Sequence, residues 1–251
     1  MKKLGVLGNG ISYSLSPEIH NSFAKEHGID IVYEIFDIPV NPIGFIESFF
    51  NQGGVGLNIT KPYKEIVAEK FSKDLNSVNC LYGKPINSSS TDGVGLIADL
   101  KSKNIETKDK NILIWGMGGA GISVVKEFSQ NQTTFIANRS KEKISMIQNS
   151  FSNVEEYANQ EIDLVIMCVD DIDHHTETQI RKINLSKDAY IYDINYTGNT
   201  LNIIKTLELV AKNRIFNGLG MLVEQAAESY RLWFNYSPST ENIKNFLDER
   251  L

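Results

Sequence analysis

The sequence has little of what marks secreted, membrane-spanning or nucleic-acid-binding proteins. Its two cysteines, Cys80 and Cys168, each lie in an apolar run, so we expect buried free thiols and a reducing, cytoplasmic location. No stretch reaches the roughly eighteen apolar residues of a membrane helix, so no membrane partner is expected. The N-terminal apolar run is short and broken by glycine, unlike a signal peptide. The net charge of −6 and the lack of a long basic run argue against nucleic acid.

The composition is that of an ordinary globular protein. Hydrophobic residues make up 41% and charged residues 22% of the 251 residues, which argues against wholesale disorder. This length is comfortable for two hydrophobic cores. An anionic small molecule remains possible as the partner, because local cations rather than total charge decide its binding. The sequence leaves both a monomer and a homodimer open.

Short apolar runs alternate with amphipathic segments of helical length along almost the whole chain. This alternation predicts an α/β fold in which helices connect parallel strands. A polar stretch, 87–90, interrupts the pattern, and Pro62 is expected in the first turn of a helix. The expected strands are 4–7, 31–36, 55–60, 111–115, 134–137, 164–168 and 190–193, and expected helices begin near Pro17, Gly93, Gly220 and Pro238.

A glycine-rich turn lies at the start of the second block of the pattern. Residues 116–121 read GMGGAG, so Gly116, Gly118 and Gly121 match G-x-G-x-x-G, with Gly119 and Ala120 in the same turn. The turn follows an apolar strand and opens a helix, which is the setting in which such a turn binds a dinucleotide. Its glycines allow a pyrophosphate to approach the helix N-terminus. The alternative is a strand–helix turn without a ligand.

The end of the next strand indicates which dinucleotide is bound. NAD sites usually place Asp or Glu there, whereas this chain has Asn138, Arg139 and Ser140, with Lys143 beyond. Arg139 can form paired hydrogen bonds with a 2′-phosphate that an acid would repel. The segment therefore favours NADP over NAD. The alternative is a solvated helix start with Ser140 as its N-cap.

These patterns predict two domains. The first, 1–98 and 222–251, is expected to contain a mainly parallel sheet, with the two C-terminal helices packing back on it. The second, 99–221, is expected to be a Rossmann-type nucleotide domain.

Five short segments contain more unusual polar residues than a fold requires. Taken together and in this order, they resemble the shikimate dehydrogenase family, and the likeness spans nearly the whole chain. The segments are 12–17 (SYSLSP), 58–64 (NITKPYK), 78–80 (VNC), 91–95 (TDGVG) and 217–225 (NGLGMLVEQ).

The resemblance implies roles for individual residues, with no metal site. Lys64 and Asp92 match the family's catalytic pair. The residues that match substrate contacts are Ser14, Ser16, Thr60, Asn79, Tyr196 and Gln225. The residues placed at the cofactor are Gly116, Gly118, Gly119, Ala120, Gly121, Asn138, Arg139, Ser140, Lys143, Ile194 and Gly218.

The implied activity is the reversible, NADPH-dependent reduction of 3-dehydroshikimate to shikimate, on the route to chorismate and the aromatic amino acids. Two alternatives are a quinate/shikimate dehydrogenase that prefers NAD and a non-catalytic module that senses a metabolite. Both dehydrogenase interpretations require the amine of Lys64 and the turn at 116–121 to face a shared groove.

Simple physical arguments bear on the same residues. Lys64 is expected in the first turn of a helix, where the macrodipole disfavours a cation, and the carboxylate of Asp92 would compensate for it. A solvated surface lysine is the alternative. Asp92 and Ser16 can each be an N-cap instead of a functional residue. Gln225 lies on an otherwise apolar helix face, where an amide requires a partner.

The chain departs from the family pattern at several positions. It has Tyr13 where histidine is frequent, Cys80 where threonine is usual and Ser90 where asparagine is usual. None of these changes removes a catalytic group. The segment 170–175 (DDIDHH) replaces small residues and threonine near the cofactor. Its spacing fits no established metal site, so we expect a solvated acidic loop.

Overall fold

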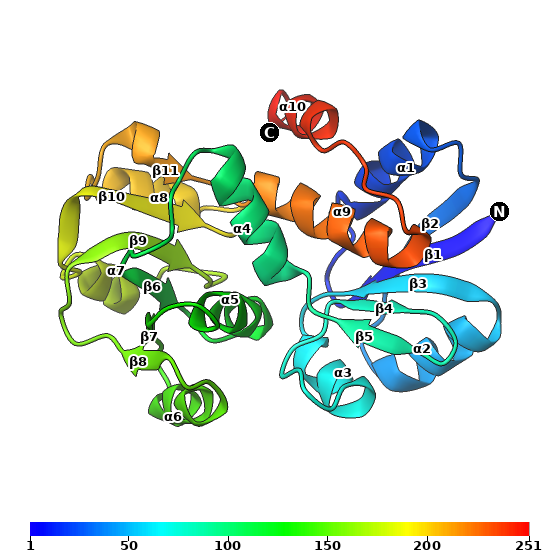
Figure 1. Cartoon of the computed structure of the whole chain (residues 1–251), viewed down its shortest axis with the longest axis horizontal. Helices are drawn as coiled ribbons and strands as arrows, with labels where there is room; N and C mark the ends of the chain where they lie inside the picture. Colours follow the sequence, from blue (N-terminus) through cyan, green and yellow to red (C-terminus); the bar gives the residue numbers. More distant parts are fainter. Residues whose placement is uncertain (251) are drawn as a thin grey trace. The chain divides into compact units, whose positions relative to one another are not determined.

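The computed structural model describes residues 1–250 and divides them into two compact units. The first unit contains Met1–Leu96 and Val223–Arg250, and the second contains Ile97–Leu222. The chain passes from one unit to the other within helices α4 (Asp92–Ser102) and α9 (Leu219–Phe234), labelled in Figure 1. The assignment of 1–98 with 222–251 to the substrate and of 99–221 to the nucleotide stays a prediction. Its last residue, Leu251, lies outside the described residues.

A five-stranded sheet with the order β2-β1-β3-β4-β5 forms the first unit. Its first three strands are parallel, and the last two are antiparallel. The expectation that 87–90 merely interrupts the pattern is wrong, because Asn87–Ser89 pairs with Cys80–Tyr82. A short polar strand at a sheet edge carries no hydrophobic alternation that would reveal it. The strands are β1 (Lys2–Gly8), β2 (Ile31–Asp37), β3 (Gly54–Ile59), β4 (Cys80–Tyr82) and β5 (Asn87–Ser89).

Both faces of β1 are buried, as expected for a central parallel strand. Leu4 and Val6 pack with Tyr33 and Trp233 on one face, and Leu7 belongs to the core on the other. The last helix and the greater part of α9 lie in the first unit, which confirms the expectation for the C-terminal helices. The helices of this unit are α1 (Ser16–Glu26), α2 (Pro42–Asn51), α3 (Lys64–Phe71) and α10 (Glu241–Asp248), with the greater part of α9.

The placement of Pro62 within a helix is wrong. Helix α3 begins at Lys64, and Pro62 lies in the turn that precedes it. The helix therefore begins two residues later than expected, and Lys64 is its first residue.

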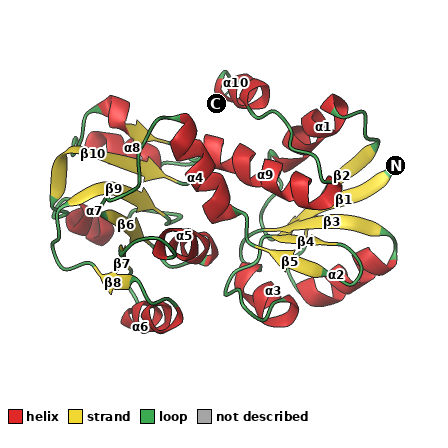
Figure 2. Cartoon of the chain, viewed as in Figure 1, coloured by secondary structure: helices red, strands yellow, loops and turns green. Residues whose placement is uncertain are grey.

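The second unit contains six parallel strands in the order β11-β10-β9-β6-β7-β8, with helices shown red in Figure 2. The strand order reverses next to β6, which is the arrangement of dinucleotide-binding folds. The strands are β6 (Ile112–Trp115), β7 (Thr134–Ala137), β8 (Val154–Glu156), β9 (Ile162–Met167), β10 (Leu185–Asp193) and β11 (Ile215–Phe216). The helices are α5 (Gly119–Ser129), α6 (Lys141–Ser150), α7 (His174–Ile180) and α8 (Thr200–Thr206).

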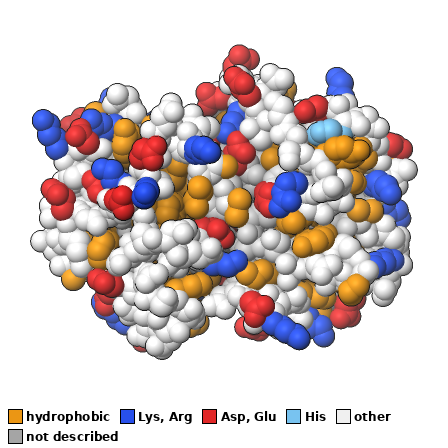
Figure 3. Space-filling view, viewed as in Figure 1, with side chains coloured by type: hydrophobic (Ala, Val, Ile, Leu, Met, Phe, Trp, Pro, Cys, Tyr) orange, Lys and Arg blue, Asp and Glu red, His pale blue; other side chains and the backbone are white. Residues whose placement is uncertain are grey.

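Acidic and basic side chains are interspersed over the face of the molecule shown in Figure 3. Within residues 1–250, no helix has both the length and the apolar character needed to cross a membrane.

Candidate active site

Lys64 and Asp92 form an ion pair in the first unit. The Nζ atom of Lys64 lies 2.5 Å from Oδ2 of Asp92. Lys64 is the first residue of α3 and Asp92 the first residue of α4, so turns that leave the sheet position both side chains. The carboxylate offsets the cost of placing a cation at the positive end of α3. The two side chains are only 15% and 7% exposed, which excludes the solvated-surface alternative for Lys64.

Asn79 holds the other oxygen of the Asp92 carboxylate. Its Nδ2 donates to Oδ1 of Asp92 at 2.8 Å, and its Oδ1 accepts from the backbone N–H of Thr91 at 2.7 Å. The second bond fixes which end of the amide faces Asp92. Gln225 belongs to the same cluster, with its Oε1 3.3 Å from Nδ2 of Asn79. Asp92 therefore has both carboxylate oxygens engaged by side chains. As the first helical residue of α4 it is not the N-cap, so that alternative is wrong.

Behind this cluster lies a buried set of polar side chains that the sequence did not single out as functional. Nδ2 of Asn58 donates to Oγ of Ser229 at 2.9 Å, and Ser229 lies 3.3 Å from Oγ1 of Thr91. Tyr33 donates to Oδ1 of Asn58 at 2.8 Å. The available signal was a polar residue, Asn58, within the apolar strand β3. A buried amide of this kind requires partners, but the sequence does not say which ones.

Ser14 and Ser16 contact each other at the start of α1. Oγ of Ser14 donates to Oγ of Ser16 at 3.2 Å and accepts from its backbone N–H at 3.3 Å. The N-cap interpretation of Ser16 is wrong, because α1 begins at this residue and its side chain makes no capping bond. The two hydroxyls lie beside one another, which is the arrangement expected of a carboxylate cradle.

Thr60 follows β3 directly and is half-buried. β1 and β3 are parallel neighbours, and Asn9 donates its backbone N–H to the carbonyl of Lys61 at 3.1 Å. The loops that carry Ser14 and Thr60 therefore leave the same edge of the sheet, the carboxyl edge where open α/β sheets bind ligands. Within residues 1–250, no hydrogen bond joins Ser14, Ser16 or Thr60 to the Lys64–Asp92 pair.

The glycine turn of the second unit has the geometry of a phosphate-binding turn. Gly116 has a φ of 104°, and a Cβ there would lie 2.5 Å from the carbonyl oxygen of Cys168. A Cβ at Gly121 would lie 2.0 Å from the carbonyl oxygen of Gly116. At Gly118, by contrast, no atom lies within 4 Å of such a Cβ. The turn is therefore tightly packed beneath and open at the N-terminus of α5, where Gly119 and Ala120 begin the helix. Such an opening fits a pyrophosphate.

The segment after β7 contacts this turn directly. Oδ1 of Asn138 accepts from the backbone N–H of Met117 at 3.1 Å, and Nζ of Lys143 donates to the Met117 carbonyl at 3.2 Å. Ser140 is the N-cap of α6 and accepts from the backbone N–H of Lys143. This cap does not exclude a cofactor role for the segment. Arg139 is exposed, and its guanidinium lies 3.7 Å from the carboxylate of Asp173.

Ile194 and Gly218 lie together in the second unit. A Cβ at Gly218 would come within 1.8 Å of the carbonyl oxygen of Ile194, so only glycine fits there. Ile194 follows β10, and its backbone N–H donates to the carbonyl of Met167 at the end of β9. Ile194 therefore lies on the same sheet edge as the glycine turn. Tyr196 also belongs to this unit, whereas the other residues predicted to bind substrate belong to the first.

The three acids of the segment 170–175 lie in the exposed loop that we expected, whereas the two histidines begin helix α7. Asp173 is the N-cap of α7, with its Oδ1 accepting from the backbone N–H of Thr176 at 2.7 Å, and both histidines lie on that helix. This bond and, more weakly, Arg139 and His175 lower the pKa of the Asp173 carboxyl. Within residues 1–250, no group of three or more His, Cys, Asp or Glu side chains could hold a metal ion.

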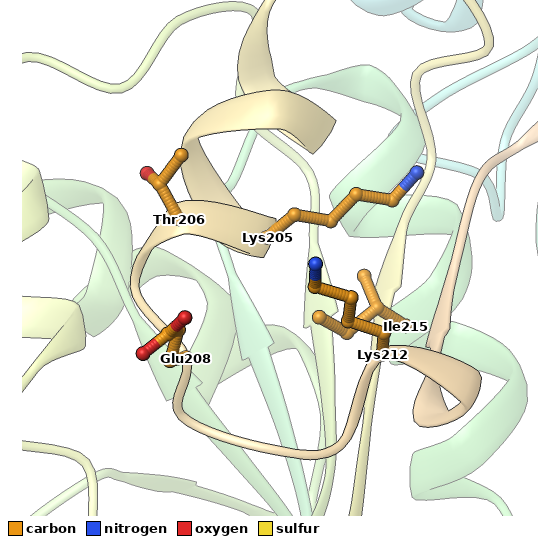
Figure 4. A pocket seen from close by; sticks show the side chains of 5 residues that line it. All are labelled: Lys205, Thr206, Glu208, Lys212 and Ile215. Carbon is orange, nitrogen blue, oxygen red and sulfur yellow. The ribbon is translucent and has the colours of Figure 1, made fainter.

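A pocket of about 590 Å³ opens on the surface of the second unit beside α8 (Figure 4). It contains none of the predicted site residues. Four of its five lining residues are exposed, so it offers no buried polar group that would select a ligand. The lining residues are Lys205, Thr206, Glu208, Lys212 and Ile215.

The chain is similar to known proteins of one family. The family described as shikimate dehydrogenase substrate binding domain matches residues 6–79, and the shikimate 5'-dehydrogenase C-terminal domain matches residues 218–245. A solved shikimate dehydrogenase in complex with NADP+ is 26% identical, with a TM-score of 0.81, over 100% of this chain and 96% of its own. The Thermus thermophilus enzyme, 22% identical, shares the fold with a TM-score of 0.83 and complete coverage of both chains.

Two relatives named shikimate dehydrogenase (NADP(+)) show the family. The protein of Legionella pneumophila (strain Lens) is 35% identical, covering 97% of each chain. That of Pyrococcus abyssi is 32% identical, covering 100% of this chain and 99% of its own. Their matches extend over the Lys64–Asp92 pair and the glycine turn alike. The chain belongs to the shikimate dehydrogenase family.

Proposed function

We propose that the protein is an NADP-dependent shikimate dehydrogenase that reversibly reduces the 3-keto group of 3-dehydroshikimate to the hydroxyl of shikimate. The observation that carries the proposal is the 2.5 Å pair of Lys64 and Asp92, held from behind by Asn79. A module that only binds a metabolite has no need of a proton donor paired with a carboxylate. The names of the relatives support the same activity and cofactor.

Within the first unit, we assign the substrate carboxylate to the adjacent hydroxyls of Ser14 and Ser16. Thr60, Asn79 and Gln225 are assigned to the ring hydroxyls. Asn79 and Gln225 support this assignment because their amides lie together beside the ion pair. Tyr196 is proposed to line the site, and its place in the second unit sets it apart from the others.

The residues of the second unit fit NADP. The open N-terminus of α5 would receive the pyrophosphate at Gly118, Gly119 and Ala120, with Gly116 and Gly121 shaping the turn. Asn138, Ser140 and Lys143 support the segment after β7, and Arg139 would pair with the 2′-phosphate. Ile194 and Gly218 are assigned to the nicotinamide. NADPH supplies the hydride when it is bound.

Lys64 supplies the proton. As negative charge grows on the carbonyl oxygen of the substrate, the ammonium of Lys64 stabilises it and then donates a proton to form the hydroxyl. Asp92 keeps the amine aligned and compensates for its charge. In the reverse direction, the neutral amine accepts the proton from the hydroxyl of shikimate. The pair thus performs acid and base catalysis with a single side chain in contact with the reacting oxygen.

A spectrophotometric assay tests the proposal. The purified chain should change nicotinamide absorbance with shikimate and NADP+, and much more slowly with quinate and NAD+. Faster reaction with quinate and NAD+ would establish the alternative dehydrogenase. Binding of shikimate with no change in absorbance would establish a sensing module.

We further propose that the protein acts in aromatic amino acid biosynthesis, in the cytoplasm, as a monomer or homodimer. Neither cysteine forms a disulfide, and Cys80 is buried as expected, whereas Cys168 is only half-buried. Burial raises the pKa of the Cys80 thiol to about 12, which keeps it protonated and unreactive. Fractionation of cells that express the chain tests the location.

A further inference from the structure

The acid Asp173 lies beside the cation assigned to the cofactor phosphate. Oδ2 of Asp173 is 3.7 Å from a guanidinium nitrogen of Arg139, and both residues belong to the second unit. Neither the fold nor catalysis by Lys64 requires an acid at this point. An acid near a bound phosphate works against binding, because like charges repel.

The carboxylate of Asp173 is fixed in place by the helix that it caps. Its Oδ1 accepts from the backbone N–H of Thr176 at 2.7 Å, and only Oδ2 faces Arg139. Arg139 is 81% exposed and has a long side chain that can turn toward a ligand, whereas Asp173 must stay at the start of α7. The negative charge therefore stays at the start of α7, whichever way the arginine side chain turns.

The two dinucleotides respond differently to that charge. NADP carries a phosphate at the ribose 2′ position, where NAD carries a neutral hydroxyl. A carboxylate that partly neutralises Arg139 weakens attraction of the phosphate and has little effect on the hydroxyl. We infer that Asp173 is a specificity-determining residue, which reduces the preference of this chain for NADP over NAD by acting through Arg139. The inference rests on the proposed role of Arg139 at the 2′-phosphate.

Asp173→Asn tests the inference without loss of the helix cap, because asparagine caps a helix as well as aspartate does. Titration calorimetry at low salt should show NADP+ binding tightened about threefold to fivefold, the range expected of an exposed ion pair. NAD+ affinity should stay within about a factor of two. Asp173→Ser, which also keeps a cap, should give the same result. The gain should shrink at high salt, because exposed charges are screened.

Two further variants separate this inference from the proposed function. Asp171→Asn removes the same charge from the same segment and should leave both affinities unchanged. Arg139→Gln should weaken NADP+ binding and abolish the gain from Asp173→Asn in the double variant. If Arg139→Gln weakens NADP+ binding but Asp173→Asn has no effect on it, the inference about Asp173 fails and the cofactor assignment of Arg139 stands. If Arg139→Gln leaves NADP+ binding unchanged, the cofactor assignment of Arg139 fails as well. A gain that persists in the double variant overturns the route through Arg139.

Discussion

The side-chain amide of Asn79 donates a hydrogen bond to the carboxylate of Asp92, with 2.8 Å between Nδ2 and Oδ1. The other carboxylate oxygen faces Lys64, so Asp92 is held between a buried amide and the proposed proton donor. Because Thr91 donates its backbone N–H to the same amide, Asn79 cannot rotate without losing two bonds. A carboxylate restrained in this way keeps the amine of Lys64 in one position. We therefore expect Asn79 to be a positioning residue in addition to its proposed contact with substrate.

Asn79→Ala should reduce both stability and turnover. It leaves Oδ1 of Asp92 and the N–H of Thr91 without these partners in a buried setting, which costs about 1–3 kcal/mol of unfolding free energy. Turnover should fall because Lys64 is no longer held in one position. Urea unfolding and steady-state kinetics measure the two effects, with exposed Asn87→Ala as the matched control. A raised KM with unchanged kcat would show that Asn79 only binds substrate.

Lys64→Ala should lower kcat by on the order of a hundredfold or more, since it removes the proposed general acid. The affinity for NADP+, measured by calorimetry, should stay nearly unchanged because the cofactor is assigned to the second unit. Lys70→Ala, which removes an exposed lysine from the same helix, is the control. Equal losses of cofactor affinity and turnover would contradict the role of Lys64.

Two alanine substitutions in the glycine turn should have opposite effects. Gly121→Ala forces a Cβ to within 2.0 Å of the Gly116 carbonyl oxygen, so it should destabilise the second unit by about 1–3 kcal/mol or more. The Cβ added in Gly118→Ala meets no atom within 4 Å, and Gly118 has an ordinary φ of −85°. The melting temperature of this variant should therefore be unchanged. Its methyl group fills the space assigned to the pyrophosphate, and NADP+ binding should weaken by about tenfold or more. Unchanged affinity in Gly118→Ala would show that no phosphate lies there.

Sequence patterns predicted the longer parallel strands and the glycine turn because both depend on local signals. An apolar strand followed by G-x-G-x-x-G specifies a strand, a turn and a helix within a few residues. The two-residue error at Pro62 and the missed short strands have a different origin. These strands are Cys80–Tyr82, Asn87–Ser89, Val154–Glu156 and Ile215–Phe216. Neither the exact helix start nor a polar edge strand leaves a periodic signal, since both depend on pairing with distant residues.

The Lys64–Asp92 pair was predicted because each residue lies in a recognisable segment. The partners behind it were not, because Asn58, Thr91 and Ser229 meet only in the folded chain. Asn58 and Ser229 are separated by 171 residues, and one sequence cannot indicate that distance in space. For the same reason, the sequence does not indicate the contact between Arg139 and Asp173.

Acid should destabilise the first unit through His20. Its ring lies 4.5 Å from that of Tyr33 and 4.8 Å from that of Trp233, is fully buried, and has no hydrogen-bond partner for either nitrogen within residues 1–250. Burial lowers the pKa of His20 from 6.5 to about 3, against a smaller opposing effect of Asn58. In the unfolded chain His20 is therefore protonated below about pH 6.5, whereas in the folded chain it is protonated only below about pH 3.

The unfolding free energy should consequently be highest above about pH 6.5 and fall as pH decreases toward 3, by up to about 1.4 kcal/mol per pH unit from this residue. Urea unfolding at a series of pH values measures the slope, and the fluorescence of Trp233 in a Trp115→Phe background reports the first unit. His20→Phe keeps an aromatic ring between its neighbours and removes the titrating group. The change of its unfolding free energy with pH should therefore lack the contribution of one proton. His174→Gln, at an exposed histidine, should retain the full slope. Equal slopes in the parent and His20→Phe would mean that the folded chain accommodates a charged His20.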